Sequence, residues 1–384
     1  MKLKKLLTIL FIILLTASSI RFVSAIAEEG EDLIAELKLF SKAMGAVMEG
    51  YVTPQKSRNL LFNAINGMLS ALDPYSIFID EEHYKLLKID MKGEYSGIGA
   101  ALEIVDRFPI ITKIKPKSSA EEVGLQIHDR IVKVDGKSTE GKDVPEVADW
   151  LRGEENTDIL LLILRAPAKE PFEVKITRKK IQIEAVNDVR VVGKAIGYFR
   201  IDNWQDHTPE QFDTAYKNLK KDGMKALIID LRNNGGGVMT SALALAERFL
   251  PKGKKIISVD SRIDVQKKEY FSSGDKVIVD IPVIIMVNEK SASASEIFSA
   301  AMQDHKKATI LGVKSYGKAS VQSVIPLDDK AAMKLTTARY MSPNGRFIDG
   351  IGITPDVVVE NKPAGSPEAD QQIRKAIELF KKYY

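Results

Sequence analysis

The sequence predicts a multidomain protein of mixed α/β and α+β class, with a helical N-terminal region, a compact β-rich domain and an α/β core of mostly parallel buried strands. Three observations predict this organisation. Apolar residues recur at helical spacing before residue 90, and short strands and turns follow between residues 93 and 178. Beyond residue 181, apolar strands without alternation are each followed by a helix. With 384 residues, the chain is long enough for two or three domains.

The first 25 residues have the layout of a secretory signal peptide. Three lysines among the first five residues precede an apolar run at 6–15, and Val-Ser-Ala at 23–25 ends in small residues. The run is shorter than the roughly 20 residues that span a bilayer, and an uncleaved anchor is the alternative. We therefore expect an exported protein, periplasmic or otherwise extracytoplasmic, with membrane association only through such an anchor.

Residues 26–90 are predicted to form the helical N-terminal region. In LLFNAINGMLSALDPYS, residues 60–76, the apolar positions Leu61, Ile65, Met68 and Leu72 follow helical spacing. The helix should end before Pro74, because the residue that precedes a proline avoids helical backbone angles.

Composition excludes several classes of function. The chain has no cysteine, so disulfides, thiolate catalysis and Cys-ligated zinc are ruled out. Its formal net charge is only +4, and no dense Lys/Arg block with interleaved aromatic residues occurs. We therefore expect no nucleic-acid partner.

Residues 91–180 are predicted to form a β-rich domain of their own. GIGAALEIV and FPIITKIKP resemble strands, and RIVKVDGK is typical of a hairpin with an Asp135-Gly136 turn. DVPEVADWLRG then predicts a helix that ends at Gly153, and TDILLLILRA a further strand.

Residues 181–360 are predicted to form the α/β core, and residues 361–384 a terminal helix. The predicted strands are residues 194–201, 225–231, 281–288 and 308–312, and the predicted helices are residues 207–223, 240–250 and 291–307.

The segment GVKSYGKASVQ, residues 312–322, has the spacing of a phosphate-binding loop. Ala319, however, stands where a magnesium-binding hydroxyl is needed, and the residues after Lys318 favour a strand over the required helix. Nucleotide binding is therefore disfavoured, and catalysis is the other possible use of Lys318.

A lysine can replace histidine as the base that activates a serine, provided that burial lowers its pKa. The chain has four histidines, none at metal-ligand spacing, and no G-x-S-x-G motif. We expect no metal or cofactor. Ser291, Ser293 and Ser295 lie at the start of the helix in SASASEIF, where backbone N–H groups can stabilise an oxyanion. Ser293 and Glu296 also fit a capping box, which needs no catalytic role.

Several segments, in order, resemble the carboxy-terminal processing peptidases, also called tail-specific proteases. They are LDPYSIF, GIGAAL, GYFRI, DLRNNGGG, the segment from SASASEIF to GKASVQ, and LTTARYMSPNGRFIDGIGITPDVVV. The resemblance implies an exported serine endopeptidase with a Ser-Lys dyad, an acyl-enzyme intermediate and an inserted PDZ domain at 91–180. The core at 181–360 would be its protease domain.

Carried over by position, the resemblance implies Ser293 as the nucleophile and Lys318 as the general base. Gln322 aligns with the glutamine that orients the lysine, which requires the chain to bend between Gly317 and Ser320. Gly236 and Ala294 would supply the backbone N–H groups of the oxyanion hole. Asp230, Arg232 and Tyr340 are interpreted as structural.

The PDZ resemblance implies that protein or peptide C-termini are the binding partners. Such domains add a peptide as a strand and hold its terminal carboxylate on backbone N–H groups, which Gly97, Ile98 and Gly99 would supply. An ordinary glycine turn is the alternative. Arg152 resembles the arginine at the interface between PDZ and protease domains, with a surface ion pair as its alternative. A homo-oligomer or an adaptor protein is left open.

Three positions depart from the family pattern. Gly235 replaces a proline, Ala319 replaces a glycine beside the base, and His128 replaces a glycine in a turn. Histidine tolerates positive φ better than most residues, whereas a left-handed conformation at Ala319 would misplace Lys318. We expect an active enzyme, and the rival hypothesis is a catalytically inactive PDZ scaffold that only binds peptides.

Overall fold

The structure is a computed structural model that describes residues 30–168, 170–275, 278–328, 331–360 and 370–381. It divides into two compact units, residues 1–78 and residues 79–384. The predicted signal peptide lies outside the described residues. Within the described part of the chain, none of the helices combines the length and the apolar composition needed to cross a bilayer.

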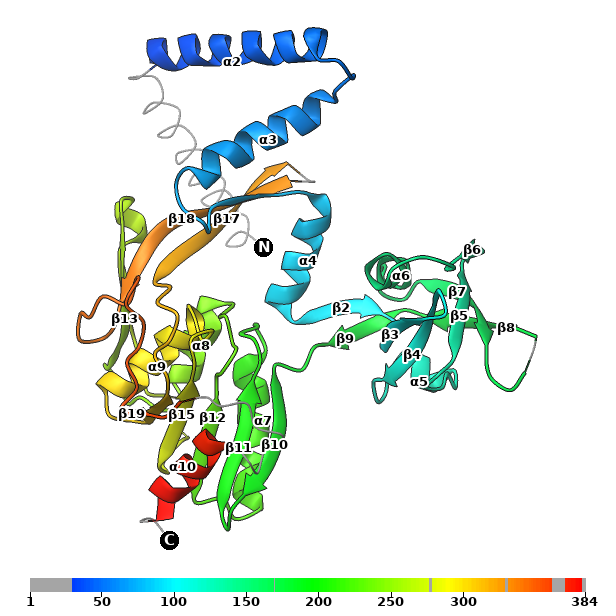
Figure 1. Ribbon diagram of the computed structural model, residues 1–384. Coiled ribbons are helices and arrows are strands. Elements are labelled where there is room, and N and C mark those ends of the chain that lie inside the picture. The colour runs from blue at the N-terminus through cyan, green and yellow to red at the C-terminus, as the bar shows by residue number, and fades with distance from the viewer. Residues whose placement is uncertain (1–29, 169, 276–277, 329–330, 361–369, 382–384) are drawn as a thin grey trace, which may run out of the picture. The chain divides into compact units, whose positions relative to one another are not determined.

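The described part of the first unit, residues 30–78, is mostly helical, as the sequence predicts. It contains α2 (Gly30–Gly50) and α3 (Ser57–Ser70), which Figure 1 draws in blue. Helix α3 ends before Pro74, as expected. A short strand, β1 (Ile77–Ile79), then interrupts the helical region, and α4 (Glu81–Lys92) opens the second unit. The Asp80 carboxylate caps α4 by accepting a hydrogen bond from the His83 N–H at 2.9 Å.

The β-rich domain is an antiparallel sheet with its own core. Its strands are ordered β3-β4-β5-β7-β8, β6 pairs with β5, and β2 and β9 form a separate ribbon. Ile111, Ile131 and Leu161 are fully buried at its centre. His128 has φ +74°, which confirms the expected left-handed turn. The elements are β2 (Glu94–Gly97), β3 (Ala100–Val105), β4 (Phe108–Ile114), α5 (Ser119–Glu122), β5 (Arg130–Val134), β6 (Lys137–Ser138), α6 (Val144–Leu151), β7 (Asp158–Leu164), β8 (Phe172–Thr177) and β9 (Lys179–Gln182).

The α/β core has a six-stranded sheet in the order β10-β11-β12-β15-β16-β19. From β11 to β19 every neighbouring pair is parallel, and β10 is antiparallel to β11. The elements are β10 (Val186–Val192), β11 (Ile196–Ile201), α7 (Thr208–Lys221), β12 (Ala226–Asp230), α8 (Met239–Ala246), β15 (Val283–Val287), α9 (Ala294–Asp304), β16 (Thr309–Gly312), β19 (Val357–Val358) and α10 (Gln371–Phe380).

Both faces of this sheet are covered, which explains why its strands do not alternate. Leu227 and Ile229 of β12 pack into the same cluster as α7, α8 and α9. Ala226 and Ile228, which point the other way, share a cluster with Ile373 of α10. Of the terminal helix predicted at 361–384, residues 371–380 form α10, which covers the second face, and residues 361–369 and 382–384 lie outside the described residues.

A second, antiparallel sheet was not foreseen in the sequence. It includes β13 (Lys255–Ser261), β14 (Lys268–Phe271), β17 (Ser320–Asp328) and β18 (Ala331–Met341), with a short 3₁₀ turn, η1 (Asp264–Gln266), between β13 and β14. Strand β17 begins two residues after Lys318, so a strand and not a helix follows the lysine, as expected. This sheet places Lys318 beside the carboxyl ends of the parallel strands.

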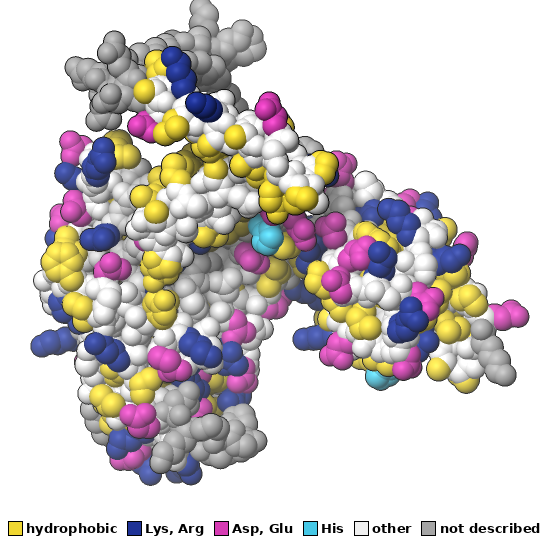
Figure 2. Space-filling model, turned by 45° about the horizontal axis from the view of Figure 1, so that its top comes forward, with side chains coloured by type: hydrophobic (Ala, Val, Ile, Leu, Met, Phe, Trp, Pro, Cys, Tyr) yellow, Lys and Arg dark blue, Asp and Glu magenta, His cyan; other side chains and the backbone are white. Residues whose placement is uncertain are grey.

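The carboxyl ends of β11, β12, β15 and β16 lie at one edge, where ligand sites of parallel α/β sheets usually form. The loops that follow these strands carry most of the sequence-predicted catalytic residues. On the face drawn in Figure 2, basic and acidic side chains are interspersed.

Candidate active site

Ser293 lies where the loop after β15 enters α9, and its backbone is strained. Its φ of 56° and ψ of −115° differ from the extended conformation that a helix N-cap normally adopts. Conformations of this kind cost about 1–3 kcal/mol and persist mainly at functional sites. Capping alone does not require this strain, so the backbone favours the nucleophile interpretation of Ser293 over the simple cap.

One buried carboxylate connects Ser293 to Lys318. Glu296 is 1% exposed, and its Oε2 accepts hydrogen bonds from the backbone N–H groups of Ser293 at 2.9 Å and Lys318 at 2.8 Å. Its Oε1 accepts from the Gly317 N–H at 2.7 Å and the Ser315 hydroxyl at 2.5 Å. Burial raises the pKa of Glu296, while these hydrogen bonds lower it. The sequence identified Glu296 only as a capping residue.

Tyr340 of β18 connects the same two residues from another side. Its hydroxyl lies 2.6 Å from the Lys318 carbonyl oxygen and 3.0 Å from the Ser293 carbonyl oxygen. A phenol has one proton, so it donates to these two acceptors in turn or shares the proton between them. Burial, and then the charges of Glu296 and Asp349, raise the pKa of Tyr340 well above its usual value, which keeps it a donor. The sequence had suggested only a structural role.

The backbone around Lys318 is compatible with the alanine that follows it. Gly317 has φ +91°, whereas Ala319 is not among the residues with positive φ. Ala319 is fully buried, and its N–H donates to the Asp349 carboxylate at 3.1 Å. The left-handed residue of this loop is therefore Gly317. Ala319 does not adopt the left-handed conformation that would have misplaced Lys318.

Gln322 lies near the start of β17, where the register with β18 shifts between Val321 and Gln322. Its Nε2 donates to the hydroxyls of Ser320 at 2.8 Å and Thr336 at 3.2 Å. The orienting role expected of Gln322 toward Lys318 therefore stays a prediction, because these hydrogen bonds of its side chain go to β17 and β18.

Gly236 lies directly against Ser293. Its φ is +106°, and a Cβ on it would lie 2.7 Å from Ser293 Cβ and 3.2 Å from the Ala294 nitrogen. The structure therefore brings together both predicted oxyanion-hole residues beside Ser293. The Gly236 N–H, however, donates to the side-chain oxygen of Asn234 at 2.9 Å. Gly235 lacks a positive φ, and a Cβ there would meet no atom within 4 Å.

A cleft of about 430 Å³ adjoins the glycine loop. Its lining residues come from α4, from the loop after β11 and from the glycine loop itself: Leu87, Asp90, Met91, Asp202, Asn203, Trp204 and Gly235 to Val238. Gly236, which lies against Ser293, is one of its lining residues.

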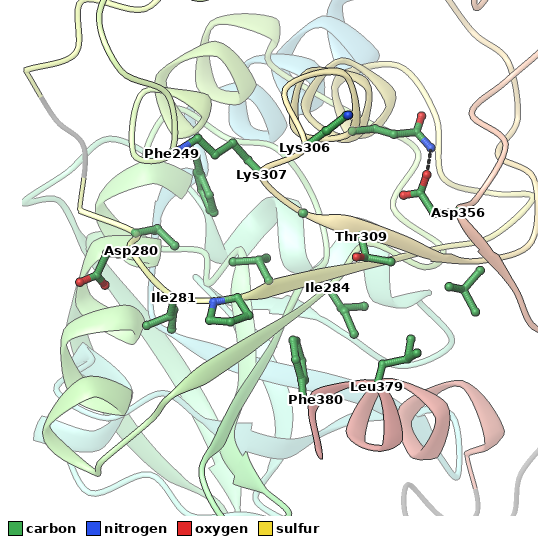
Figure 3. Close-up of a pocket in the computed structure, with 16 residues that line it drawn as sticks. Phe249, Asp280, Ile281, Ile284, Lys306, Lys307, Thr309, Asp356, Leu379 and Phe380 are labelled. Atoms are coloured by element: carbon green, nitrogen blue, oxygen red, sulfur yellow. Dashed lines mark hydrogen bonds between the residues drawn. The ribbon is translucent and has the colours of Figure 1, made fainter. Parts of the chain in front are cut away.

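Another hollow, of about 640 Å³, lies at the opposite end of the sheet. Figure 3 shows Ile284 and Thr309, at the amino ends of β15 and β16, together with Phe380 of α10. The hydrogen bond drawn there joins Gln303 to Asp356 at 2.9 Å. Ser293 and Lys318 lie in loops at the carboxyl ends of the strands, so this hollow is separate from the candidate active site.

Asp230 and Arg232 support the loop that carries the glycines. Arg232 donates to both carboxylate oxygens of Asp230, and its Nη1 donates to Asp370 at 2.7 Å and to Gln372 at 2.9 Å. Asp370 also caps α10. These contacts fit the structural interpretation of both residues. Within the described residues, no group of three His, Asp or Glu side chains is placed to hold a metal ion.

The β-rich domain has a groove between β3 and α6. It encloses about 200 Å³ and is lined by Gly97, Ile98 and Gly99 and by residues of α6 that include Ala148 and Leu151. Gly99 has φ +81°, and a Cβ there would lie 2.3 Å from Ser118 Cβ. The predicted carboxylate-binding residues therefore form one end of an apolar groove.

Arg152 follows α6 at the same groove. Its guanidinium lies 5.4 Å from the centre of the Tyr95 ring, and it makes no ion pair with the described acidic residues. The surface ion pair considered from the sequence is therefore absent from the described part of the chain.

Comparison with known proteins identifies the family. Residues 195–359 match peptidase family S41, and residues 110–165 match a PDZ domain. The chain is 37% identical over 355 residues to a carboxy-terminal-processing protease of Bartonella bacilliformis, covering 91% of this chain and 81% of the relative. It is 35% identical to a CtpA-like serine protease of Staphylococcus haemolyticus, covering 84% of this chain and 65% of that relative.

Among solved structures, the photosystem II D1 C-terminal processing protease matches with a TM-score of 0.46 and 27% identity, covering 84% of this chain and 92% of that one. The resemblance inferred from the sequence motifs is thus confirmed by the two domain matches and the Bartonella relative. The chain belongs to the carboxy-terminal-processing proteases of peptidase family S41, and it is a serine peptidase that carries a PDZ domain.

Proposed function

We propose that the enzyme cleaves peptide bonds with Ser293 as its nucleophile and Lys318 as its general base. The observation that carries this proposal is the pair of shared contacts, in which Glu296 and Tyr340 each bond to the backbones of both residues. Two residues 25 positions apart are held in one place, which is what a dyad requires. The strained backbone of Ser293 supports the same assignment.

In this mechanism the Ser293 hydroxyl attacks the scissile carbonyl and gives its proton to the Lys318 amine. The tetrahedral oxyanion is stabilised by the N–H groups of Ala294 and Gly236. Its collapse breaks the C–N bond, and Lys318 returns the proton to the leaving amine. Lys318 then takes a proton from water, the resulting hydroxide attacks the acyl-enzyme ester, and the carboxylate product is released as Ser293 recovers its proton.

The direct test replaces each member of the dyad. Ser293→Ala and Lys318→Ala are expected to abolish cleavage of an unfolded protein, and trapped wild-type enzyme should gain the mass of an acyl group on Ser293. Lys314→Ala is the matched control, because Lys314 is an exposed lysine of the same loop. Wild-type rates in either dyad variant would refute the assignment. The two sequence departures that motivated the inactive-scaffold hypothesis give it no support, since neither Ala319 nor Gly235 adopts a backbone conformation reserved for glycine.

We further propose that the PDZ groove recruits the C-terminal tails of substrate proteins. The support is an apolar groove between a strand edge and a helix, with glycines at one end where N–H groups can converge on a carboxylate. Because the groove and the cleft beside Gly236 belong to one polypeptide, a substrate whose tail is bound in the groove would be held near the cleft.

Export and self-association also remain proposals. The basic start, apolar run and small residues of 1–25 support secretion to an extracytoplasmic compartment. Fractionation of cells and the N-terminal sequence of the mature protein test this proposal of secretion.

Exposed apolar side chains on α2, among them Leu33, Ile34 and Leu37, support association with a second copy or an adaptor protein. Sedimentation of the purified enzyme distinguishes monomer from oligomer.

A further inference from the structure

Asn234 is fully buried, and the structure uses each of its polar groups. Its side-chain Nδ2 donates to the Ile201 carbonyl at 2.7 Å, and its Oδ1 accepts from the Gly236 N–H at 2.9 Å. Its backbone carbonyl accepts from the Ala292 N–H and the Ser295 hydroxyl, both at 3.0 Å. One neighbour of the amide can only donate and the other can only accept, so its orientation is fixed.

This contact concerns the reaction itself, because the Gly236 N–H is one of the two proposed oxyanion donors. An N–H that points at Asn234 does not point at the oxygen of a bound substrate. In the structure the oxyanion hole therefore offers the Ala294 N–H, while the Gly236 N–H is already used. Gly236 nevertheless lies against Ser293, so turning the peptide bond before it is enough to redirect the N–H.

We propose that Asn234 is a positioning residue that holds the Gly236 N–H away from the oxyanion site until a substrate draws it over. This inference rests on the proposed Ser-Lys mechanism. The Asn234 side chain touches no reacting atom and reaches the oxyanion site only through Gly236. It therefore affects acylation, in which the oxyanion forms, and leaves substrate binding unchanged.

Two variants separate this role from a purely structural one. Asn234→Leu and Asn234→Asp both lose the hydrogen bond to Ile201, and both keep nearly the volume of the asparagine. Only the aspartate keeps an acceptor for the Gly236 N–H, and a charged acceptor binds about twice as strongly as a neutral one. A negative charge there also opposes the oxyanion. The two variants therefore share the loss of the Ile201 contact and differ in their hold on Gly236. Because the aspartate also buries a charge, both variants are compared per folded molecule.

The experiment uses the full-length enzyme and a peptide boronate, which forms a tetrahedral adduct on a reactive serine. Adduct formation is measured per folded molecule, with Ser293→Ala as the blank, and kcat and KM are measured with a peptide substrate. We expect adduct formation and kcat to rise about two- to tenfold in Asn234→Leu, the value of one neutral hydrogen bond. In Asn234→Asp both should fall about 100-fold, the usual effect of losing one oxyanion donor. KM should change little in either variant.

Comparable losses in both variants would overturn the proposal and leave Asn234 with a structural role. Hydrogen exchange of the Gly236 N–H gives a test that does not depend on catalysis. Slow exchange in the wild type that becomes fast in Asn234→Leu supports the contact, and equally fast exchange in both overturns it. If the wild type forms no adduct that depends on Ser293, the proposed mechanism itself fails, and this inference fails with it.

Discussion

Ser293 and Lys318 donate their backbone N–H groups to the same oxygen atom, Oε2 of Glu296, at 2.9 and 2.8 Å. The two residues are far apart in the sequence, and they belong to the start of a helix and to the loop before a strand of another sheet. A single buried carboxylate therefore fixes the relative positions of both elements. In the proposed mechanism the approach of the two side chains depends on this anchor, since small displacements of reacting groups lower rates strongly.

Replacing this carboxylate tests its importance. In Glu296→Gln one oxygen becomes an NH₂ group that faces at least one backbone N–H donor, and each unpaired buried donor costs about 1–3 kcal/mol. We expect kcat per folded molecule to fall about 100-fold, a loss typical of misplacing reacting groups by about 1 Å. Glu289→Gln is the control, because Glu289 is exposed on the loop before the same helix. Peptidase assays measure kcat of both variants, and thermal denaturation measures their stability. Equal kcat values in Glu296→Gln and Glu289→Gln would contradict the anchoring role.

The pH dependence of the enzyme follows from the same group. Burial raises the pKa of Glu296, so it takes up a proton at a higher pH than an exposed glutamate does. The protonated carboxyl has lost acceptor capacity toward Ser293 and Lys318, so activity should fall in mild acid. The sign for stability is opposite. A raised pKa means that the folded state binds the proton first, so this group's contribution to the free energy of unfolding increases as pH falls through the folded-state pKa.

We therefore expect a reversible loss of activity in mild acid while the protein remains folded. A pH–rate profile recorded beside the circular dichroism spectrum checks this. Activity that persists until the spectrum itself is lost would refute the explanation. Glu289→Gln should reproduce the wild-type profile.

The order of the core elements could be predicted from the sequence because its strands are apolar on both faces and each is followed by a helix. The second sheet was missed, since β17 and β18 are only half-buried along most of their length and show neither pattern clearly. The serine and lysine could be found by resemblance. The contacts of Glu296 with Lys318, and of Tyr340 with Ser293, span 22 and 47 positions, so no local pattern contains them.

The glycine loop provides a matched pair of substitutions. Gly236→Ala would place a Cβ 2.7 Å from Ser293 Cβ and 2.9 Å from the Ala292 carbonyl oxygen, at a backbone conformation that alanine avoids. We expect at least a 100-fold loss of kcat. Gly235→Ala meets no atom and no unfavourable φ, so it should stay folded and active. The kcat of the two purified variants is compared with that of the wild type. A comparable loss in both variants would contradict the close approach of Gly236 to Ser293.

The contribution of the PDZ domain can be separated from catalysis by filling its groove. Ala148 lines the groove between β3 and α6, so Ala148→Phe would occupy the space that a bound C-terminal residue needs. We expect the KM for a protein substrate with a free tail to rise about tenfold, which is the loss of roughly 1.4 kcal/mol of binding. Cleavage of a short peptide too small to reach the groove should keep its rate. Ala168→Phe adds the same ring to an exposed position in the β7–β8 connection of the same domain and should leave both substrates unaffected. If Ala148→Phe instead slows both substrates equally, the groove acts on the catalytic centre and does more than hold the tail.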